Sequence, residues 1–105
     1  MEDGFDLKVG LRGDLAIVTV TGELDPYGSQ EFPDCLEGLV AFGYAVVIID
    51  LSGVTYIDSG GLDALVRANK RAQAAGARLI VLKPSAGVNR VLDITGVSTM
   101  VAVLA

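Results

Sequence analysis

The sequence of 105 residues contains no histidine and a single cysteine, Cys35. One cysteine cannot form an internal disulfide, and the lack of a Cys/His cluster gives no basis for a structural zinc site. We therefore expect a reducing compartment, no bound metal and no other cofactor. Because a chain of this length buries enough surface to fold without cross-links, residues 1–105 are expected to form one domain.

Long apolar runs are missing as well. No stretch approaches the roughly 20 apolar residues of a membrane-spanning helix, and the acidic segment 1–10 lacks the basic start of a signal peptide. Positive charge is scarce: eight basic residues stand against 13 acidic ones, giving a net charge of −5. This balance argues against binding to a nucleic-acid backbone. The sequence thus predicts a cytoplasmic protein that binds neither membrane nor nucleic acid.

Strand and helix patterns alternate along the chain. Residues 5–11 alternate apolar and polar side chains, a turn follows at 12–14, and 15–21 is rich in β-branched residues, which predicts a β-hairpin. The apolar runs 46–51 and 78–82 are typical of strands covered on both faces. Further apolar spacing predicts a helix from Phe32 onward, helices over 58–75 and 85–95, and a last strand over 100–104.

The resulting order, ββαβαβαβ, indicates an α/β fold. Strands that alternate with helices pair in parallel through right-handed crossovers. We expect one mixed β-sheet flanked by helices, with an antiparallel first pair and parallel strands after it. Pro33 suits the first turn of the first helix, which predicts a late start or a kink there. Ser52 and Gly53 are predicted to form a polar loop, with Asp50 capping the turn.

The candidate functional residues lie in Tyr56-Ile57-Asp58-Ser59-Gly60-Gly61-Leu62, where a loop passes into the second helix. In the simplest interpretation, Asp58 or Ser59 caps the helix through a side-chain oxygen. The segment has neither a P-loop motif nor GxGxxG, so it does not predict a phosphate cradle. Ser59 lacks a histidine or a suitably spaced lysine as its base, so hydrolase chemistry is not expected. Accepting phosphate from a separate kinase requires only an exposed hydroxyl, which makes Ser59 a candidate phosphorylation site.

The chain resembles the STAS-domain anti-sigma factor antagonists nearly from end to end. The resemblance is carried by Gly22-Glu23-Leu24-Asp25, by Asp50-Leu51-Ser52-Gly53-Val54-Thr55-Tyr56-Ile57-Asp58-Ser59 with Gly61-Leu62, and by Val91-Leu92-Asp93-Ile94-Thr95-Gly96-Val97. It implies the STAS fold and a protein that is not an enzyme. Such a protein binds an anti-sigma factor serine kinase, thereby frees a sigma factor, and is released when a serine is phosphorylated. A PP2C-type phosphatase is implied for the reset.

By position, the resemblance makes Ser59 the phosphorylated residue. It implies that Asp58 contributes to the kinase contact and that Asp25 lies at the mouth of the same surface. The other expected partner-binding residues follow Ser59 on the first turns of the helix: Gly60, Gly61, Asp63 and Arg67. Many relatives have Ser, Thr or Ala where this chain has Gly60, and often glycine where it has Asp63. These departures bear on the phosphorylation rate and on which kinase is cognate.

Two alternative functions remain open. The chain could be a docking subunit that is not phosphorylated, in a stress-signalling or lipid-transport assembly. Alternatively, strand-end aspartates beside Lys83 could accept phosphate with Mg²⁺, as in response-regulator receivers, although the opening hairpin argues against that arrangement.

A separate expectation concerns self-association. Relatives often continue with a further helix after the last strand. The surface that this helix would cover is a candidate for weak homodimer formation.

Overall fold

The computed structural model describes residues 5–24 and 30–104. Within them, the elements follow the predicted order, with a short 3-10 helix, η1, added before the last strand. The bounds are β1 (Phe5–Arg12), β2 (Leu15–Leu24), α1 (Glu31–Phe42), β3 (Val46–Ile57), α2 (Ser59–Ala74), β4 (Arg78–Leu82), α3 (Ala86–Ile94), η1 (Val97–Thr99) and β5 (Ala102–Leu104). The described helices include none that is long and apolar enough to cross a membrane.

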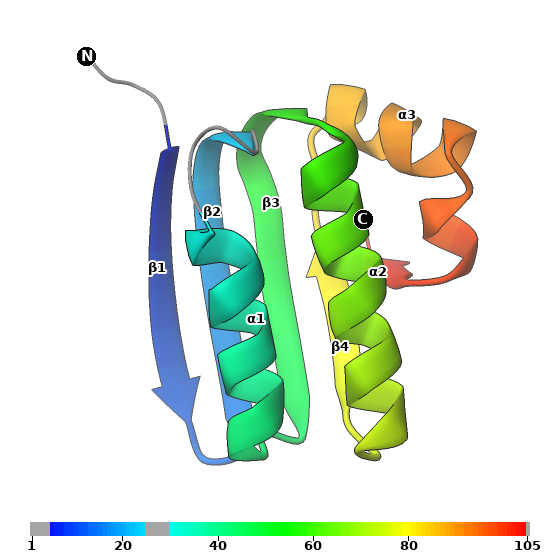
Figure 1. Cartoon of the computed structure of the whole chain (residues 1–105). Helices are drawn as coiled ribbons and strands as arrows, with labels where there is room; N and C mark the ends of the chain where they lie inside the picture. The colour runs from blue at the N-terminus through cyan, green and yellow to red at the C-terminus, as the bar shows by residue number, and fades with distance from the viewer. Residues whose placement is uncertain (1–4, 25–29, 105) are drawn as a thin grey trace.

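The strands form one five-stranded sheet in the order β1-β2-β3-β4-β5. The first two strands pair antiparallel, and every later pair is parallel. The predicted mixed sheet is therefore confirmed. Because the parallel strands point the same way, their carboxyl ends meet at one edge, and the loop into α2 lies at this edge (Figure 1).

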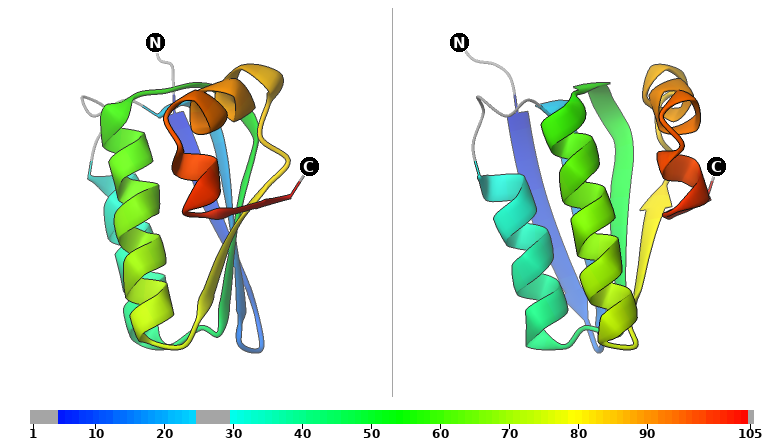
Figure 2. Two further views of the ribbon diagram at one scale, coloured as in Figure 1. Left: turned by 90° about the vertical axis from the view of Figure 1, so that its right-hand side faces the viewer. Right: turned by 45° about the vertical axis from the view of Figure 1, so that its right-hand side comes forward.

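The helices lie mainly on one side of the sheet. Helices α1 and α2 run side by side across one face, whereas α3 lies near the carboxyl ends of the parallel strands (Figures 1 and 2). On the opposite face, Ile17, Ile48 and Ile80 occupy one row across β2, β3 and β4, and Ile48 and Ile80 are half-buried. The apolar runs of β3 and β4 predicted that both faces of these strands would be covered. In the structure, only their side chains on the helical face are fully buried.

Two strands extend beyond their predicted ends. Ser52 and Gly53 lie within β3, not in a loop, because the end of β2 pairs with residues of β3 up to Ile57. The register shifts within this stretch, which is typical of a β-bulge. A Cβ at Gly53 would come within 2.7 Å of Thr21 Cγ2, so the close approach of the two strands requires glycine.

Three local features of the sequence can be compared with the structure: Asp50, Pro33 and Gly76. The backbone N–H of Ser52 donates to Asp50 Oδ1 over 2.9 Å. Asp50 was predicted to cap a turn, but this bond lies within the continuous strand β3. Helix α1 begins at Glu31, one residue before the predicted Phe32, so its start is not late. Pro33 lies in its first turn, as predicted. Helix α2 is followed by Gly76, which adopts a φ of 75° just past the helix end.

The core lies between the sheet and helices α1 and α2, and Leu65 of α2 is among its fully buried side chains. Replacing it with alanine is expected to lower the free energy of unfolding by about 2–5 kcal/mol, because lost burial and a residual cavity both contribute. Urea denaturation measures this change. Leu104→Ala is the matched control: that leucine is 53% exposed, and the expected change is within about 0.5 kcal/mol. Equal effects of the two substitutions would contradict this packing.

Candidate functional site

The segment between β3 and α2 is fixed to the end of β2. The backbone N–H of Asp58 donates to the carbonyl of Leu24 over 3.1 Å, and the N–H of Leu62 donates to the carbonyl of Asp58 over 3.0 Å. The first bond joins the segment to the neighbouring strand, and the second begins the hydrogen bonding of α2. The start of α2 is therefore set by the sheet and not by a long loop.

Asp58 is the N-cap of α2. Its backbone is extended, with φ −105° and ψ −173°, and its Oδ1 accepts from the N–H of Gly61 over 3.0 Å. This bond satisfies one of the amide groups that a helix N-terminus leaves without an intrahelical partner. The sequence left open whether Asp58 or Ser59 caps the helix, and the structure assigns the cap to Asp58.

Ser59 is the first residue of α2 and is exposed. Its hydroxyl makes no hydrogen bond to any residue in 5–24 or 30–104. Because the cap belongs to Asp58, modification of the Ser59 hydroxyl would break no bond in this part of the fold. The side chain also lies beside the free N–H groups of a helix N-terminus, whose dipole favours a negative charge.

Gly61 serves packing more than surface chemistry. It is buried, and a Cβ at this position would lie 2.8 Å from Ile57 Cγ1 and 3.3 Å from Leu24 Cβ. Neither atom is the end of a long flexible side chain, so a larger residue would push α2 away from the strand ends. The preceding Gly60 is exposed. Of the two glycines, only Gly60 therefore offers surface to a partner.

Asp63 and Arg67 form an ion pair on the outer side of α2. Arg67 Nε lies 3.0 Å from Asp63 Oδ2, and the two side chains are 65% and 59% exposed. An exposed pair at this spacing contributes little to stability, yet it offsets the negative charge that Asp63 brings near Ser59. Further along the helix, Arg71 approaches Glu37 of α1 at 4.0 Å. The basic side of α2 is thus partly neutralised within the molecule.

The structure brings most of the predicted site residues together. Ser59, Gly60, Gly61, Asp63 and Arg67 all lie on the first turns of α2, and Asp58 precedes them directly. Asp25 lies outside the described residues. The described residues, which exclude Asp25, contain no group of three His, Cys, Asp or Glu side chains that could hold a metal ion.

Two further residues shape this edge of the molecule. Tyr56 is 51% exposed on β3, where it pairs with Glu23 of β2. Ser85 caps α3, and its hydroxyl donates to the carbonyl of Val54 over 2.8 Å, which fastens α3 to the end of β3. The sequence carried signals for both, since Tyr56 belongs to the loop motif and Ser85 precedes an apolar helical pattern. Their positions depend on the unpredicted extension of β3.

Cys35 lies half-buried on α1 and packs against the core. Burial, and then the negative charge of Glu31, raises the pKa of its thiol above the usual value. The thiol is therefore neutral near pH 7, which fits a packing role and not a reactive one.

A family model described as "STAS domain" matches residues 7–104. Among curated proteins, the anti-sigma-B factor antagonist of Staphylococcus epidermidis is 33% identical over 102 residues, covering 97% of this chain and 84% of the relative. The anti-sigma-B factor antagonist of Listeria monocytogenes is 31% identical over 86 residues, covering 82% of this chain and 75% of the relative. The similarity thus extends over nearly all of the sheet and its helices.

Solved structures agree with the fold. A crystal structure of a putative anti-sigma factor antagonist from Thermotoga maritima superposes with a TM-score of 0.86 at 24% identity, covering 94% of this chain and 86% of the other. The Bacillus cell fate determinant SpoIIAA in its phosphorylated form superposes with a TM-score of 0.75 at 17% identity, covering 95% and 92%. At these identities, the two structures establish a shared fold.

The assignment of the cap gives a test on two adjacent residues. Asp58→Ala is expected to lower the free energy of unfolding by about 1 kcal/mol, because the N–H of Gly61 loses its acceptor. Ser59→Ala removes a hydroxyl without a partner among the described residues, so the expected change is within about 0.5 kcal/mol. Urea denaturation of both variants measures the difference. The reverse order of effects would assign the cap to Ser59.

The raised pKa of Cys35 predicts slow alkylation. At pH 8, iodoacetamide should modify the folded protein more slowly than the same chain unfolded in urea, because less of the folded thiol is in the reactive thiolate form. The pH at which the folded rate reaches half its maximum should likewise exceed the unfolded value. Equal rates and equal midpoints in the two states would contradict the effect of burial on this thiol.

Proposed function

This chain belongs to the STAS domain family, and on that premise we propose that it is an anti-sigma factor antagonist switched off by phosphorylation of Ser59. Its partner in this proposal is an anti-sigma factor with serine kinase activity. When the antagonist holds this partner, a sigma factor is freed. The observation that carries the proposal is the exposed Ser59 hydroxyl, which makes no hydrogen bond to the described residues and lies beside a helix N-terminus that Asp58 already caps.

The curated relatives support this function. The similar protein from Staphylococcus epidermidis bears the name anti-sigma-B factor antagonist, and its similarity covers 97% of this chain. SpoIIAA, which shares the fold, exists in a phosphorylated form, so a STAS fold can hold a phosphate. These relatives favour a regulator that works by binding and is not itself an enzyme, located in the cytoplasm with its kinase.

The kinase is proposed to dock on the start of α2 and the strand ends beside it. Gly60, Asp63 and Arg67 offer exposed contacts there. Asp58 contributes by fixing the turn, and its second oxygen, Oδ2, makes no hydrogen bond to the described residues. Asp25 is assigned to the same surface from the family resemblance alone. A small exposed residue at Gly60 lets a partner approach the backbone closely.

Phosphoryl transfer requires little of this chain. The Oγ of Ser59 attacks the γ-phosphorus of ATP held by the kinase; an O–P bond forms, the bond to ADP breaks, and a base of the kinase takes the hydroxyl proton. The antagonist supplies an accessible oxygen at a fixed position, and the kinase supplies the nucleotide and the catalytic groups. A PP2C-type phosphatase is proposed to hydrolyse the phosphoserine and restore binding.

The charge of the phosphate explains why binding is lost while the fold persists. A phosphoserine carries about −1.5 to −2 charges at neutral pH. Within the domain, this charge lies next to the N-terminus of α2 and remains in contact with water. In a complex, the same dianion would be buried against the kinase without a prepared cation, and its lost hydration would have no compensation.

The test incubates the protein with ATP and an anti-sigma factor kinase from the same organism, and intact mass reports the phosphate gained. Wild-type protein is expected to gain one phosphate and Ser59→Ala none, whereas Ser52→Ala, at an exposed serine on β3, should still gain one. The phosphorylated form should bind the kinase about 100-fold more weakly or worse, because an unpaired charge is buried. Titration calorimetry measures the affinities.

Two results would contradict the proposal. Phosphorylation that persists in Ser59→Ala would place the switch at another residue. Unmodified wild-type protein that still binds a kinase would make the chain a constitutive docking subunit of a signalling or transport assembly.

A further inference from the structure

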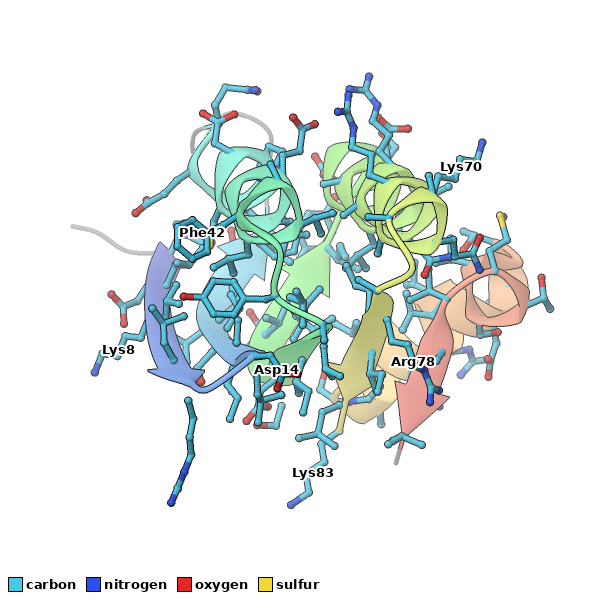
Figure 3. All side chains as sticks on the ribbon, turned by 90° about the horizontal axis from the view of Figure 1, so that it is seen from below. Lys8, Asp14, Phe42, Lys70, Arg78 and Lys83 are labelled. Carbon is cyan, nitrogen blue, oxygen red and sulfur yellow. The ribbon has the colours of Figure 1, made fainter. Side chains whose placement is uncertain are left out.

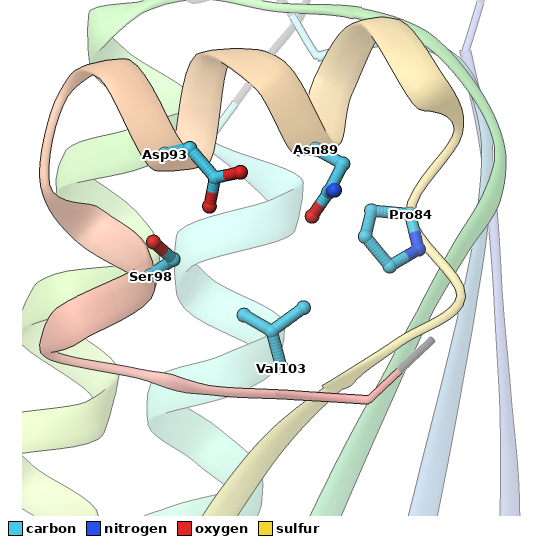
Figure 4. Close-up of a pocket in the computed structure, with 5 residues that line it drawn as sticks. All are labelled: Pro84, Asn89, Asp93, Ser98 and Val103. Atoms are coloured by element: carbon cyan, nitrogen blue, oxygen red, sulfur yellow. The ribbon is translucent and has the colours of Figure 1, made fainter.

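A separate cavity of about 330 Å³ lies among α3, η1 and β5 (Figure 4). Its walls come from Asn89 and Asp93 of α3, Ser98 of η1, Pro84 from the segment before α3, and Val103 of β5. The volume is at the lower end of the range for small-molecule sites. None of these residues belongs to the Ser59 site, so the cavity is unexplained by the proposed function.

Three polar side chains face this cavity without partners. Asn89 and Asp93 are one helical turn apart on α3, and Figure 4 shows the Asp93 carboxylate and the Asn89 amide oxygen directed into the same space. Across residues 5–24 and 30–104, the side chains of Asn89, Asp93 and Ser98 make no hydrogen bond or ion pair. Their hydrogen-bonding capacity is therefore available to a ligand.

The character of the lining selects the ligand. Among the described residues that line the cavity, Asp93 is the only charged one, and it is accompanied by two neutral groups that can accept hydrogen bonds. Lys83, which precedes Pro84, extends from the sheet away from the helices (Figure 3) and does not line the cavity. The polar wall thus favours a cation with several N–H donors. Opposite it, Pro84 and Val103 supply an apolar wall suited to a short carbon chain.

We propose that this cavity binds a small primary alkylamine, with its ammonium group between Asp93 and Asn89 and its carbon chain against Pro84 and Val103. Asp93 belongs to the Val91–Val97 segment that carries part of the family resemblance. Its backbone carbonyl accepts from the N–H of Gly96 at the end of α3, but its side chain makes no hydrogen bond or ion pair to the described residues. A lysine side chain of a partner protein has the same chemistry. The experiment below distinguishes a free amine from a lysine of a partner.

The test titrates ¹⁵N-labelled protein with butylamine and follows backbone amide shifts. Saturable shifts are expected at Asn89, Ser98 and Val103. Asp93→Asn preserves the shape of the side chain and should weaken binding about fivefold or more, because a charge-assisted hydrogen bond is replaced by a neutral one. Asn89→Ala should weaken it as well. Asp34→Asn removes an exposed carboxylate on α1, and the affinity should not change.

Two control ligands test whether binding depends on the charge of the amine and whether a lysine side chain binds better than a free amine. Butanol keeps the carbon chain without the charge, and equal affinity for butanol would overturn the role of Asp93. Nα-acetyl-lysine methylamide represents a lysine of a partner, and tighter binding of this compound than of butylamine would overturn the assignment to a free amine. Unchanged butylamine affinity in Asp93→Asn would remove the proposed site altogether. None of these measurements involves Ser59 or the kinase, so their results are independent of the proposed phosphorylation switch.

Discussion

The candidate site at the start of α2 depends on one interaction, the hydrogen bond from the Gly61 N–H to the Asp58 carboxylate. It sets the start of α2, so the neighbouring Ser59 is not needed to cap the helix. A serine that capped the helix could be modified only by breaking the helix start. By placing the cap one residue earlier, this chain keeps the proposed phosphate acceptor exposed and its helix start intact. The close packing of Gly61 on Ile57 and Leu24 holds the cap and the acceptor against the strand ends.

That geometry separates stability from binding. The phosphate would enter at the molecular surface, where solvent and the helix N-terminus can accommodate it. The same charge is unfavourable only when a second protein covers the site. A switch built this way needs no conformational change within the domain, because the partner interface alone responds. The ion pair between Asp63 and Arg67 fits this arrangement, since it moderates the charge near Ser59 while remaining open to a partner.

The sequence predicted the architecture well and the strand ends poorly. Hydrophobic periodicity placed every strand and α-helix that the structure describes, and the motif around Ser59 indicated the candidate site. Periodicity could not show that β3 continues through Ser52 and Gly53, because polar residues and glycine are typical of loops, and only pairing with β2 makes them part of a strand. The choice between Asp58 and Ser59 as cap was likewise beyond the sequence. Both are good capping residues, and the three-dimensional approach of the Gly61 N–H decides between them.

Asp58 and Asp93 show why a motif aspartate has no fixed meaning. Both belong to segments that carry the family resemblance, and both lie at a helix terminus. The carboxylate of Asp58 is used within the fold, since it accepts from a backbone N–H at 3.0 Å. The carboxylate of Asp93 has no such bond in the described structure and faces a cavity with two other unpartnered side chains. Asp93 is exposed, so solvent hydrates its charge, and what distinguishes it from other surface carboxylates is its place in the wall of a cavity. The proposed amine site rests on that placement, whereas the role of Asp58 rests on a hydrogen bond within the fold.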